Sequence, residues 1–551
     1  MVVGCTVPSA VPTDRSTQAA AQTGPRGTLR IAWRIEPDSL ESKLTTGAGS
    51  PDFFWVFNSF LTYRDFTGTP HPMLINEIPT PENGLWTINP DGTMRTTFRI
   101  RDSARWHDMT PLTAQDYVFG FEVHADPEVP VVNREIEGYI DSVEAADERT
   151  LVVAWKRPYV FANVLGLHDL VPLPRHLMEA KYRTNKGNFT QGEEWTASYV
   201  GTGPFRVERW SPGIGLTARA HAGWALGAPK LESLEIRFIA EASTLLANLL
   251  AGEVDVTTSP AVGVPEALIA RDEWVARGEG TLKTWETRLH YLEFQYREVP
   301  NWQPAVADVR VRRAMTHAID RPALAEALTH GLGTSAEYFV TRQDPIYAEV
   351  ERTAARYPYD PNRARALLAE AGWRGSGSGP AVNANGQTLH AELSATGRLE
   401  SAATIVSDYW KTAGINASLS VIAPARERDR EFRASFRSTF VGERTISTDN
   451  FYWTSSQIPS AATRFAELNR GGFSDTEIDR LYDVAVSSFD SQAQREAALA
   501  IHRRMADTVG YLPLMYPVEI ILARRTVTGP IGNYGPQTGV TWNIWDWQID
   551  T

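Results

Sequence analysis

Signals for both strands and helices recur along almost the whole of this 551-residue chain, with no long linker to separate them. Residues 28–35 read TLRIAWRI, in which every second residue is apolar, and residues 93–100 and 233–239 alternate in the same way. A period of two predicts strands that bury one face. The low-complexity run at residues 375–379 (GSGSG) is short. About two to four domains are expected at this length, and without linkers we expect them to exchange strands.

Helix starts are predicted at four places. Residues 113–116 (TAQD) and 474–477 (SDTE) have the spacing of a capping box, in which a hydroxyl residue precedes an acidic residue by three positions. Asp360 stands before a proline and Asp490 before an apolar helical face, so both are predicted N-caps. Helices that alternate with strands in this way place the chain in the α/β class.

Charge restricts the partners of the chain. Lys and Arg number 54 against 66 Asp and Glu, a formal net charge of −12 at pH 7. This balance gives no overall attraction to nucleic acid or to anionic lipid, so we predict no nucleic-acid partner. No run of 18 apolar residues occurs, so no membrane-spanning helix is predicted.

Signatures of catalysis are mostly missing from the sequence. The eleven histidines never fall at the short spacings of a metal site, one cysteine cannot build a thiolate site, and neither G-x-S-x-G nor a Walker loop occurs. Residues 213–218 match G-x-G-x-x-A but follow a predicted hairpin turn. We predict no catalytic residue, no cofactor and no metal. A hydrolase that uses two carboxylates far apart in sequence stays open as the alternative.

The single cysteine, Cys5, ends the run V-V-G-C. An apolar-apolar-small-Cys run resembles the lipobox of bacterial lipoproteins, whose cysteine carries a diacylglyceryl anchor. Residues 6–27 are rich in Ser, Thr, Ala, Pro and Gln without an apolar period, which is typical of a flexible tether. We therefore expect residues 1–27 to be a lipobox remnant and tether behind a truncated signal peptide; the alternative is an incidental cysteine.

Five motifs then follow one another in order. Residues 91–116 contain DGTMRTTFRIR and WHDMTPLTAQD, residues 200–205 read VGTGPF, and residues 308–321 run from DVRVRRA to AIDR. Residues 359–372 run from YDP to LLAEAG, and residues 472–479 begin with GFSD. Together these motifs resemble solute-binding protein family 5, the receptors of oligopeptide, dipeptide and nickel ABC importers. The resemblance extends from about residue 28 to the end of the chain.

The physical interpretation of these motifs is structural. Residues 201–204 form a tight turn, Asp320 is expected to cap a helix, and Arg310 and Arg312 are expected to hold acids or carbonyls near a domain boundary. None of these side chains has to touch a ligand.

The resemblance implies a two-lobed, periplasmic-binding-protein-like (type II) α/β fold with an extra inserted domain and a hinge between the lobes. By analogy, domain I (lobe 1) comprises residues 28–56, 199–288 and 515–551, domain II is an insertion of residues 57–198, and domain III (lobe 2) spans residues 289–514. The ligand would lie between domains I and III and be enclosed when they swing together. The closed form would deliver its cargo to the permease.

The resemblance also indicates positions that would meet the ligand. They follow the first strand, begin domain III, lie in or near the segment where peptide receptors place aromatic residues, or stand at the return to domain I: Glu36, Asp38, Ser39, Trp55, Phe294, Tyr296, Arg444, Asp449, Tyr452, Trp453 and Tyr516. Each of them has an alternative role in core or hinge packing. Where the family usually has Asn, this chain has Gln295.

One departure from the family bears on the cargo. Peptide receptors commonly carry an Asp in a D-x-x-D-P-like stretch that pairs with the α-amine of the peptide, whereas residues 442–453 read GERTISTDNFYW here. Asp449 or Glu443 would have to replace it, because a buried ammonium without a carboxylate is costly. The 17 tryptophans would also suit a sugar or an aromatic cargo.

We therefore predict a non-catalytic, monomeric, extracytoplasmic substrate-binding subunit of an ABC importer. It would be anchored to the cytoplasmic membrane as a lipoprotein through Cys5 and would work with the transmembrane permease subunits. The predicted ligand is a peptide or peptide-like solute. The alternative ligand is a non-peptide solute: an oligosaccharide, an opine, a metal chelate or an aromatic compound.

Overall fold

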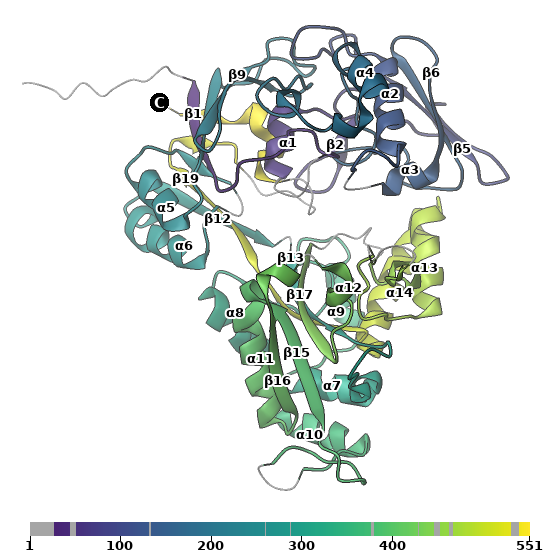
Figure 1. The fold of residues 1–551 in the computed structure, drawn as a ribbon, viewed down its shortest axis with the longest axis vertical. Coiled ribbons are helices and arrows are strands. Elements are labelled where there is room, and N and C mark those ends of the chain that lie inside the picture. Colours follow the sequence, from purple (N-terminus) through teal and green to yellow (C-terminus); the bar gives the residue numbers. More distant parts are fainter. Residues whose placement is uncertain are drawn as a thin grey trace, which may run out of the picture.

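The structure is a computed structural model. It describes residues 27–44, 51–131, 134–258, 261–286, 288–375, 379–427, 429–445, 452–461, 465, 467–530 and 539–550. Three larger sheets, of seven, six and four strands, organise the described chain, and helices pack on their faces (Figure 1). The predicted α/β class is therefore confirmed. No helix in the described part of the chain combines the length and the hydrophobicity that crossing a bilayer needs.

Lobe 1 is built on the seven-stranded sheet, with strand order β12-β19-β11-β1-β10-β9-β8. Its strands are β1 (Thr28–Trp33), β8 (Phe205–Ser211), β9 (Gly215–Ala220), β10 (Ser233–Phe238), β11 (Val256–Thr257), β12 (Gly280–Glu286) and β19 (Val518–Arg524). Helix α1 (Pro51–Phe57) packs in the same core, and helices α5 (Ala242–Leu250) and α6 (Val264–Ala270) form a second cluster with this sheet.

The first strand corrects a detail of the sequence interpretation. Alternation predicted burial of one face, but Ala32 is buried as well, because α5 and α6 cover the second face of β1. A parallel strand between two neighbours is commonly buried on both faces. Ile35, at the end of the alternating run, lies beyond the strand and is 48% exposed.

The insertion is the four-stranded antiparallel sheet together with its helices, from β4 to α4 (Figure 1). Its strands, in the order β4-β5-β7-β6, are β4 (Trp86–Ile88), β5 (Met94–Arg99), β6 (Ile140–Ala145) and β7 (Thr150–Trp155). Its helices are α2 (Ala114–Ala125), α3 (Glu135–Tyr139) and α4 (Arg175–Thr184). A two-stranded ladder of β2 (Thr62–Arg64) and β3 (Pro70–Pro72) precedes it.

Lobe 2 is built on the six-stranded sheet, with strand order β14-β18-β13-β17-β15-β16. Its strands are β13 (Arg288–Phe294), β14 (Thr334–Ser335), β15 (His390–Thr396), β16 (Asn416–Ile422), β17 (Thr439–Thr445) and β18 (Tyr511–Tyr516). Its helices are α7 (Val309–His317), α8 (Arg321–Thr329), α9 (Tyr347–Thr353), α10 (Pro361–Glu370), α11 (Glu400–Thr412), α12 (Arg430–Arg433), α13 (Thr476–Ser487) and α14 (Ser491–Thr508).

The chain crosses between lobe 1 and lobe 2 twice within these sheets. One residue separates β12 of lobe 1 from β13 of lobe 2, and one residue separates β18 of lobe 2 from β19 of lobe 1. β12 pairs with β19 and β13 with β18, so the two crossings lie side by side. Two adjacent single-residue connections make a hinge of small cross-section.

The helix starts agree with the caps read from the sequence, with one correction. The capping box at Thr113 and Asp116 begins α2, while Asp360 and Asp490 cap α10 and α14 through backbone N–H groups. At α13 the cap is Asp475, whose carboxylate accepts from the N–H groups of Glu477 and Ile478. The predicted cap, Ser474, was wrong by one residue. Its hydroxyl instead contacts the hydroxyl of Ser455.

The turn at residues 200–205 joins the chain that leaves the insertion to lobe 1. A Cβ on Gly203 would lie 2.3 Å from the carbonyl carbon of Phe57, so this close approach to the end of α1 requires glycine. The turn is held from the insertion by His107. The Gly201 N–H donates to His107 Nδ1 over 3.1 Å, and His107 Nε2 lies 3.2 Å from the Gly203 carbonyl.

Candidate ligand-binding site

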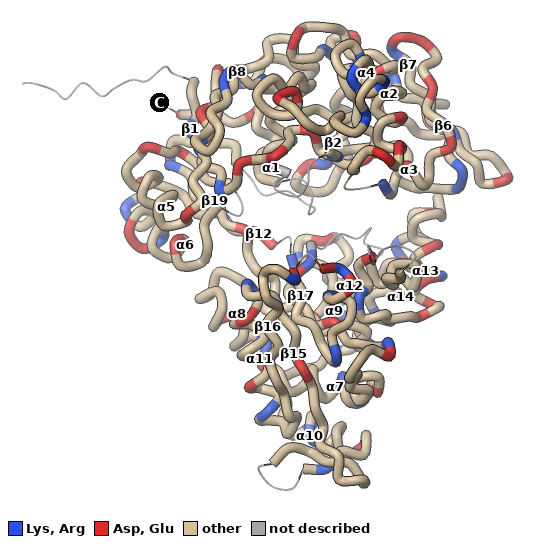
Figure 2. Tube along the Cα trace, in the orientation of Figure 1, with Lys and Arg blue, Asp and Glu red and all other residues tan. Residues whose placement is uncertain are grey.

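One edge of the lobe 2 sheet faces lobe 1. β13 begins directly after the crossing, β17 runs antiparallel to β13, and β15 runs parallel to β17. The start of β13 and the ends of β15 and β17 therefore meet at the same edge, beside the hinge. Figure 2 shows basic and acidic residues gathered at this end of lobe 2, next to β17 and on the side toward lobe 1.

Five charged or titratable side chains form a cluster at this edge, which we name the hinge cluster: Arg288, His290, Arg398, Glu443 and Glu519. Glu443 is its centre. Arg288 Nη1 lies 2.6 Å from Glu443 Oε1, while Arg398 Nη2 lies 2.7 Å and His290 Nε2 3.3 Å from Glu443 Oε2. Arg288 also reaches Glu519 of β19, over 3.4 Å, so one guanidinium connects lobe 2 to lobe 1.

The electrostatics of the hinge cluster favour a charged Glu443. Burial by itself would raise the pKa of its carboxyl, but hydrogen bonds and charge interactions with His290 and Arg288 outweigh burial and hold the pKa well below its usual range. The Glu443 side chain is 7% exposed, whereas that of Arg398 is 65% exposed. The acid is thus enclosed by bases, and the Arg398 guanidinium retains contact with solvent.

The next residue, Arg444, lies in an aromatic environment. Its guanidinium carbon is 4.5 Å from the ring centre of Tyr452, 5.3 Å from that of Tyr291 and 5.9 Å from that of Trp453. Nη2 donates to the Leu468 carbonyl over 2.8 Å, and the buried Nη1 has no hydrogen-bond partner among the residues that the structure describes. Stacking on aromatic faces stabilises a guanidinium without neutralising it. Arg444 therefore keeps its charge next to Glu443 of the hinge cluster.

On lobe 1, the residues after β1 are held by that lobe itself. Glu36 Oε1 accepts from Trp210 Nε1 over 2.7 Å, and its Oε2 accepts from the Gly213 N–H over 2.9 Å. Glu36 therefore fixes the β8–β9 hairpin. Ser39 is buried and accepts from the Glu41 N–H, whereas Asp38 is exposed.

The aromatic candidates lie mainly in the cores of the two lobes. Trp55 and Phe294 are fully buried, Trp453 packs against Phe339 and Tyr511, and Tyr516 donates to the carbonyls of Tyr338 and Val340. The Tyr296 hydroxyl donates to the Gly510 carbonyl over 2.9 Å. Ligand contacts from these residues remain predictions. Asp449 and Cys5 lie outside the described residues.

The sequence interpretation missed most of the hinge cluster. It named Glu443 as a substitute amine anchor but not Arg288, His290, Arg398 or Glu519. His290 is paired with Glu443 across the β13–β17 ladder, so the available signal was strand register, which a single sequence does not provide. In the described part of the chain, no group of three His, Cys, Asp or Glu residues is arranged to hold a metal ion.

The model of the family "bacterial extracellular solute-binding proteins, family 5 Middle" matches residues 80–461. The chain belongs to this family. A protein of Brucella ovis that is named as an ABC transporter peptide-binding protein is 27% identical over 360 residues, which cover 64% of this chain and 62% of the relative. This solute-binding protein thus spans about three fifths of the length of that relative.

Solved structures show the same fold. NikZ of Campylobacter jejuni, in complex with Ni(L-His), superposes with a TM-score of 0.74 at 21% identity and covers 95% of this chain and all of NikZ. The oligopeptide-binding protein AppA of Bacillus subtilis, in complex with a nonapeptide, gives 0.73 at 20% identity over 96% of this chain and all of AppA. The predicted two-lobed binding-protein fold is confirmed by these similarities.

Proposed function

We propose that this solute-binding protein is the extracytoplasmic substrate-binding subunit of an ABC importer. It captures a peptide or peptide-like solute between lobe 1 and lobe 2 and passes it unchanged to the permease subunits. The observation that carries the proposal is the double crossing between the two sheets beside the hinge cluster. A ligand that binds the closed form better than the open form shifts the population toward closure. The names of the Brucella relative, a peptide-binding protein, and of AppA, an oligopeptide-binding protein, support a peptide as cargo.

The same crossing supports the proposed domain boundaries. Lobe 1 would comprise residues 28–56, 199–288 and 515–551, the insertion residues 57–198, and lobe 2 residues 289–514. The connections after Glu286 and after Tyr516 fall within about two residues of two of these limits. Proteolysis of the isolated pieces would test whether each region folds as a unit.

We infer that the hinge cluster meets a carboxylate of the solute. Both carboxylate oxygens of Glu443 already accept from basic side chains, so an incoming ammonium would have to displace them. Arg398 is exposed, and a guanidinium binds a carboxylate through two parallel hydrogen bonds. Glu36, Asp38 and Ser39 would complete the site from lobe 1, and Arg444, Asp449 and Tyr452 from lobe 2.

A metal chelate is the second candidate solute. The exposed guanidinium of Arg398 suits an anionic chelate as well as a peptide carboxylate, and NikZ is in complex with Ni(L-His). The abundance of tryptophan lends less support to a sugar, because Trp33, Trp106 and Trp410 are among several that are fully buried.

The anchor at Cys5 is proposed separately. A lipoprotein would incorporate a labelled fatty acid in the host cell, and Cys5→Ala would abolish the label and release the chain from the membrane fraction. Retention of the label in Cys5→Ala would contradict lipidation at this residue.

Sedimentation of the purified chain tests the proposed monomer.

Native mass spectrometry of the freshly purified full chain, repeated after denaturation, tests the function. A spread of excess masses that fit short peptides would support the main proposal, and one mass with a metal isotope pattern would support the chelate. Arg398→Gln should lose the retained mass, whereas Arg437→Gln should keep it. Arg437 lies just before the start of β17, and its guanidinium is also exposed and pairs with Glu392. Retention in both variants would contradict the carboxylate assignment.

A further inference from the structure

The lobes meet at a second place, away from the hinge. The Val160 N–H of the chain after β7 donates to the Val486 carbonyl at the end of α13, over 3.0 Å. The ring of Trp86, on β4, meets the ring of Phe489, between α13 and α14, edge to face at 5.3 Å. In Figure 1 these helices lie at the side of lobe 2, below the insertion. We name Trp86, Val160, Val486 and Phe489 the rim contact.

The hydrogen bond at the rim satisfies a specific backbone group. Val486 lies in the last turn of α13, where carbonyls have no donor within the helix. The N–H of Ser488 turns back to the Val484 carbonyl and leaves the Val486 carbonyl for a donor from elsewhere. Val160 supplies that donor from across the lobe boundary. When the lobes separate, the carbonyl must exchange this donor for water.

The aromatic pair provides the side-chain part of the rim contact. Phe489 is 41% exposed, and among the described residues its ring meets the insertion through Trp86. Trp86 stands on β4, the edge strand of the insertion sheet, and is 7% exposed. An edge-to-face pair of this kind is worth about 0.5–1.5 kcal/mol beyond its buried area.

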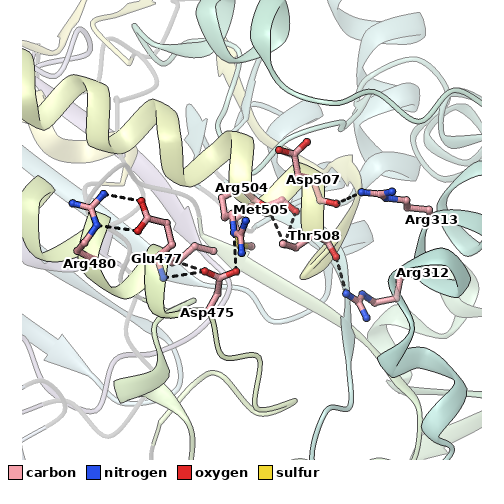
Figure 3. A network of polar contacts seen from close by, with 10 residues as sticks. Arg312, Arg313, Asp475, Glu477, Arg480, Arg504, Met505, Asp507 and Thr508 are labelled. Carbon is pink, nitrogen blue, oxygen red and sulfur yellow. Dashed lines mark hydrogen bonds and ion pairs between the residues drawn. The ribbon is translucent and has the colours of Figure 1, made fainter.

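The segments on both sides of the rim contact are fixed by further contacts within their own domains. On the insertion, Tyr159 stacks on Trp155 at 5.5 Å and lies 4.6 Å from Tyr139, which fixes the chain at Val160. On lobe 2, Figure 3 shows how the far end of the α13–α14 hairpin is anchored. Arg504 of α14 pairs with Asp475, the cap of α13, over 2.9 Å.

The arginines of α7 secure the end of α14 in the same view (Figure 3). Arg312 donates to the Thr508 carbonyl and Arg313 to the Asp507 carbonyl, each over 2.7 Å. Cations at a helix C-terminus bind the free carbonyls and complement the helix dipole. The α13–α14 hairpin is thus fixed to the base of lobe 2, so rotation of that lobe carries the hairpin with it.

We propose that the rim contact is a latch that holds the two lobes closed and thereby slows the release of the captured solute. The hinge joins the lobes at one side, and the latch joins them at the other through the insertion. The insertion therefore takes part in closure although it belongs to neither sheet of the hinge. This inference rests on the proposed capture of a solute between the lobes.

The test measures the distance across the rim in the full chain without added solute. Spin labels at the exposed positions Asp141 and Asp483 report it, in a background in which Cys5→Ser removes the only native thiol. Phe489→Ala should raise the ratio of separated to closed forms by about 2- to 10-fold, the worth of one aromatic pair. Phe489→Asp should raise it further, because a carboxylate would face the Trp86 ring.

Phe432→Ala is the matched control. Phe432 is 38% exposed, and its ring lies under Arg426 of the same lobe. Unchanged distances in both Phe489 variants, or an equal shift in Phe432→Ala, would overturn the latch. Because no solute is added, either result leaves the test of capture by mass spectrometry intact, and failure to find a retained solute leaves the latch intact.

Discussion

The two lobes are joined at the hinge and at the rim by different physical means. At the hinge, two covalent strand connections run side by side, and Arg288 forms ion pairs with acids of both lobes. At the rim, one backbone hydrogen bond and one aromatic pair connect the insertion to α13 and the turn that follows it. The covalent connections at the hinge persist whatever the angle between the lobes, whereas the rim contacts require the insertion and lobe 2 to approach each other. A protein that must open and close needs strong contacts at the first place and weak ones at the second.

The strength of the hinge depends on Glu443. Glu443→Gln leaves Arg288, His290 and Arg398 without their shared acid, so we expect the free energy of unfolding to fall by about 3 kcal/mol. Equilibrium denaturation in urea measures the change. Asp408→Asn, which removes one acid of an exposed pair with Lys411, should cost at most about 0.5 kcal/mol. Equal losses in the two variants would show that the hinge cluster behaves like any surface pair.

The rigidity of the rim depends on Arg312. Its guanidinium donates to the carbonyls of Val306, Ala307, Thr508 and Val509, a set that lysine cannot match with one ammonium group. Arg312→Lys should therefore cost about 2 kcal/mol. Amide hydrogen exchange should speed up in α13 and α14 but not in β13. Arg365→Lys, at an exposed position of α10, should leave exchange unchanged; faster exchange throughout lobe 2 would contradict a local role.

Between pH 7 and 5.5, the smallest effect is expected at the turn between the insertion and lobe 1. Burial, together with the neighbouring His221, lowers the pKa of His107 to about 3, against about 6.5 in the unfolded chain. The unfolded state therefore binds more protons below pH 6.5, and stability falls as the pH drops from 6.5 toward 3. The slope for one such group approaches about 1.4 kcal/mol per pH unit.

Glu443 should contribute little to this slope between pH 7 and 5.5. The pKa of Glu443 is lower in the folded chain than in the unfolded chain, so its charged form stabilises the fold at any pH above the pKa of a free carboxyl. This stabilisation is lost as the pH falls below that pKa. His107→Asn should reduce the slope between pH 7 and 5.5 by about 1 kcal/mol per pH unit in denaturation series. His330→Asn, at an exposed histidine after α8, should preserve it. An unchanged slope in His107→Asn would assign the acid sensitivity to other buried groups.

The sequence alone predicted the features that depend on near neighbours in the chain. The Thr113–Asp116 box and the caps Asp360 and Asp490 were predictable because a cap bonds to N–H groups two or three residues away. The order of five motifs was sufficient to indicate the family, and the two-lobed fold followed from that resemblance. Arg312 could be predicted to hold carbonyls, but not that two of them belong to residues 508 and 509.

The tertiary structure decided which polar groups meet across the lobes. Arg288 of lobe 2 and Glu519 of lobe 1 lie far apart in the sequence, as do Val160 and Val486, so no local pattern links either pair. The same limit applies to the aromatic candidates. Trp453 was placed by sequence among ligand-facing rings, and its packing on Phe339 and Tyr511 became visible only in the fold. Local hydrogen bonds form between residues close in sequence and can be predicted from it. The hinge cluster and the latch depend on strand register and on the relative position of the lobes, and long-range packing determines both.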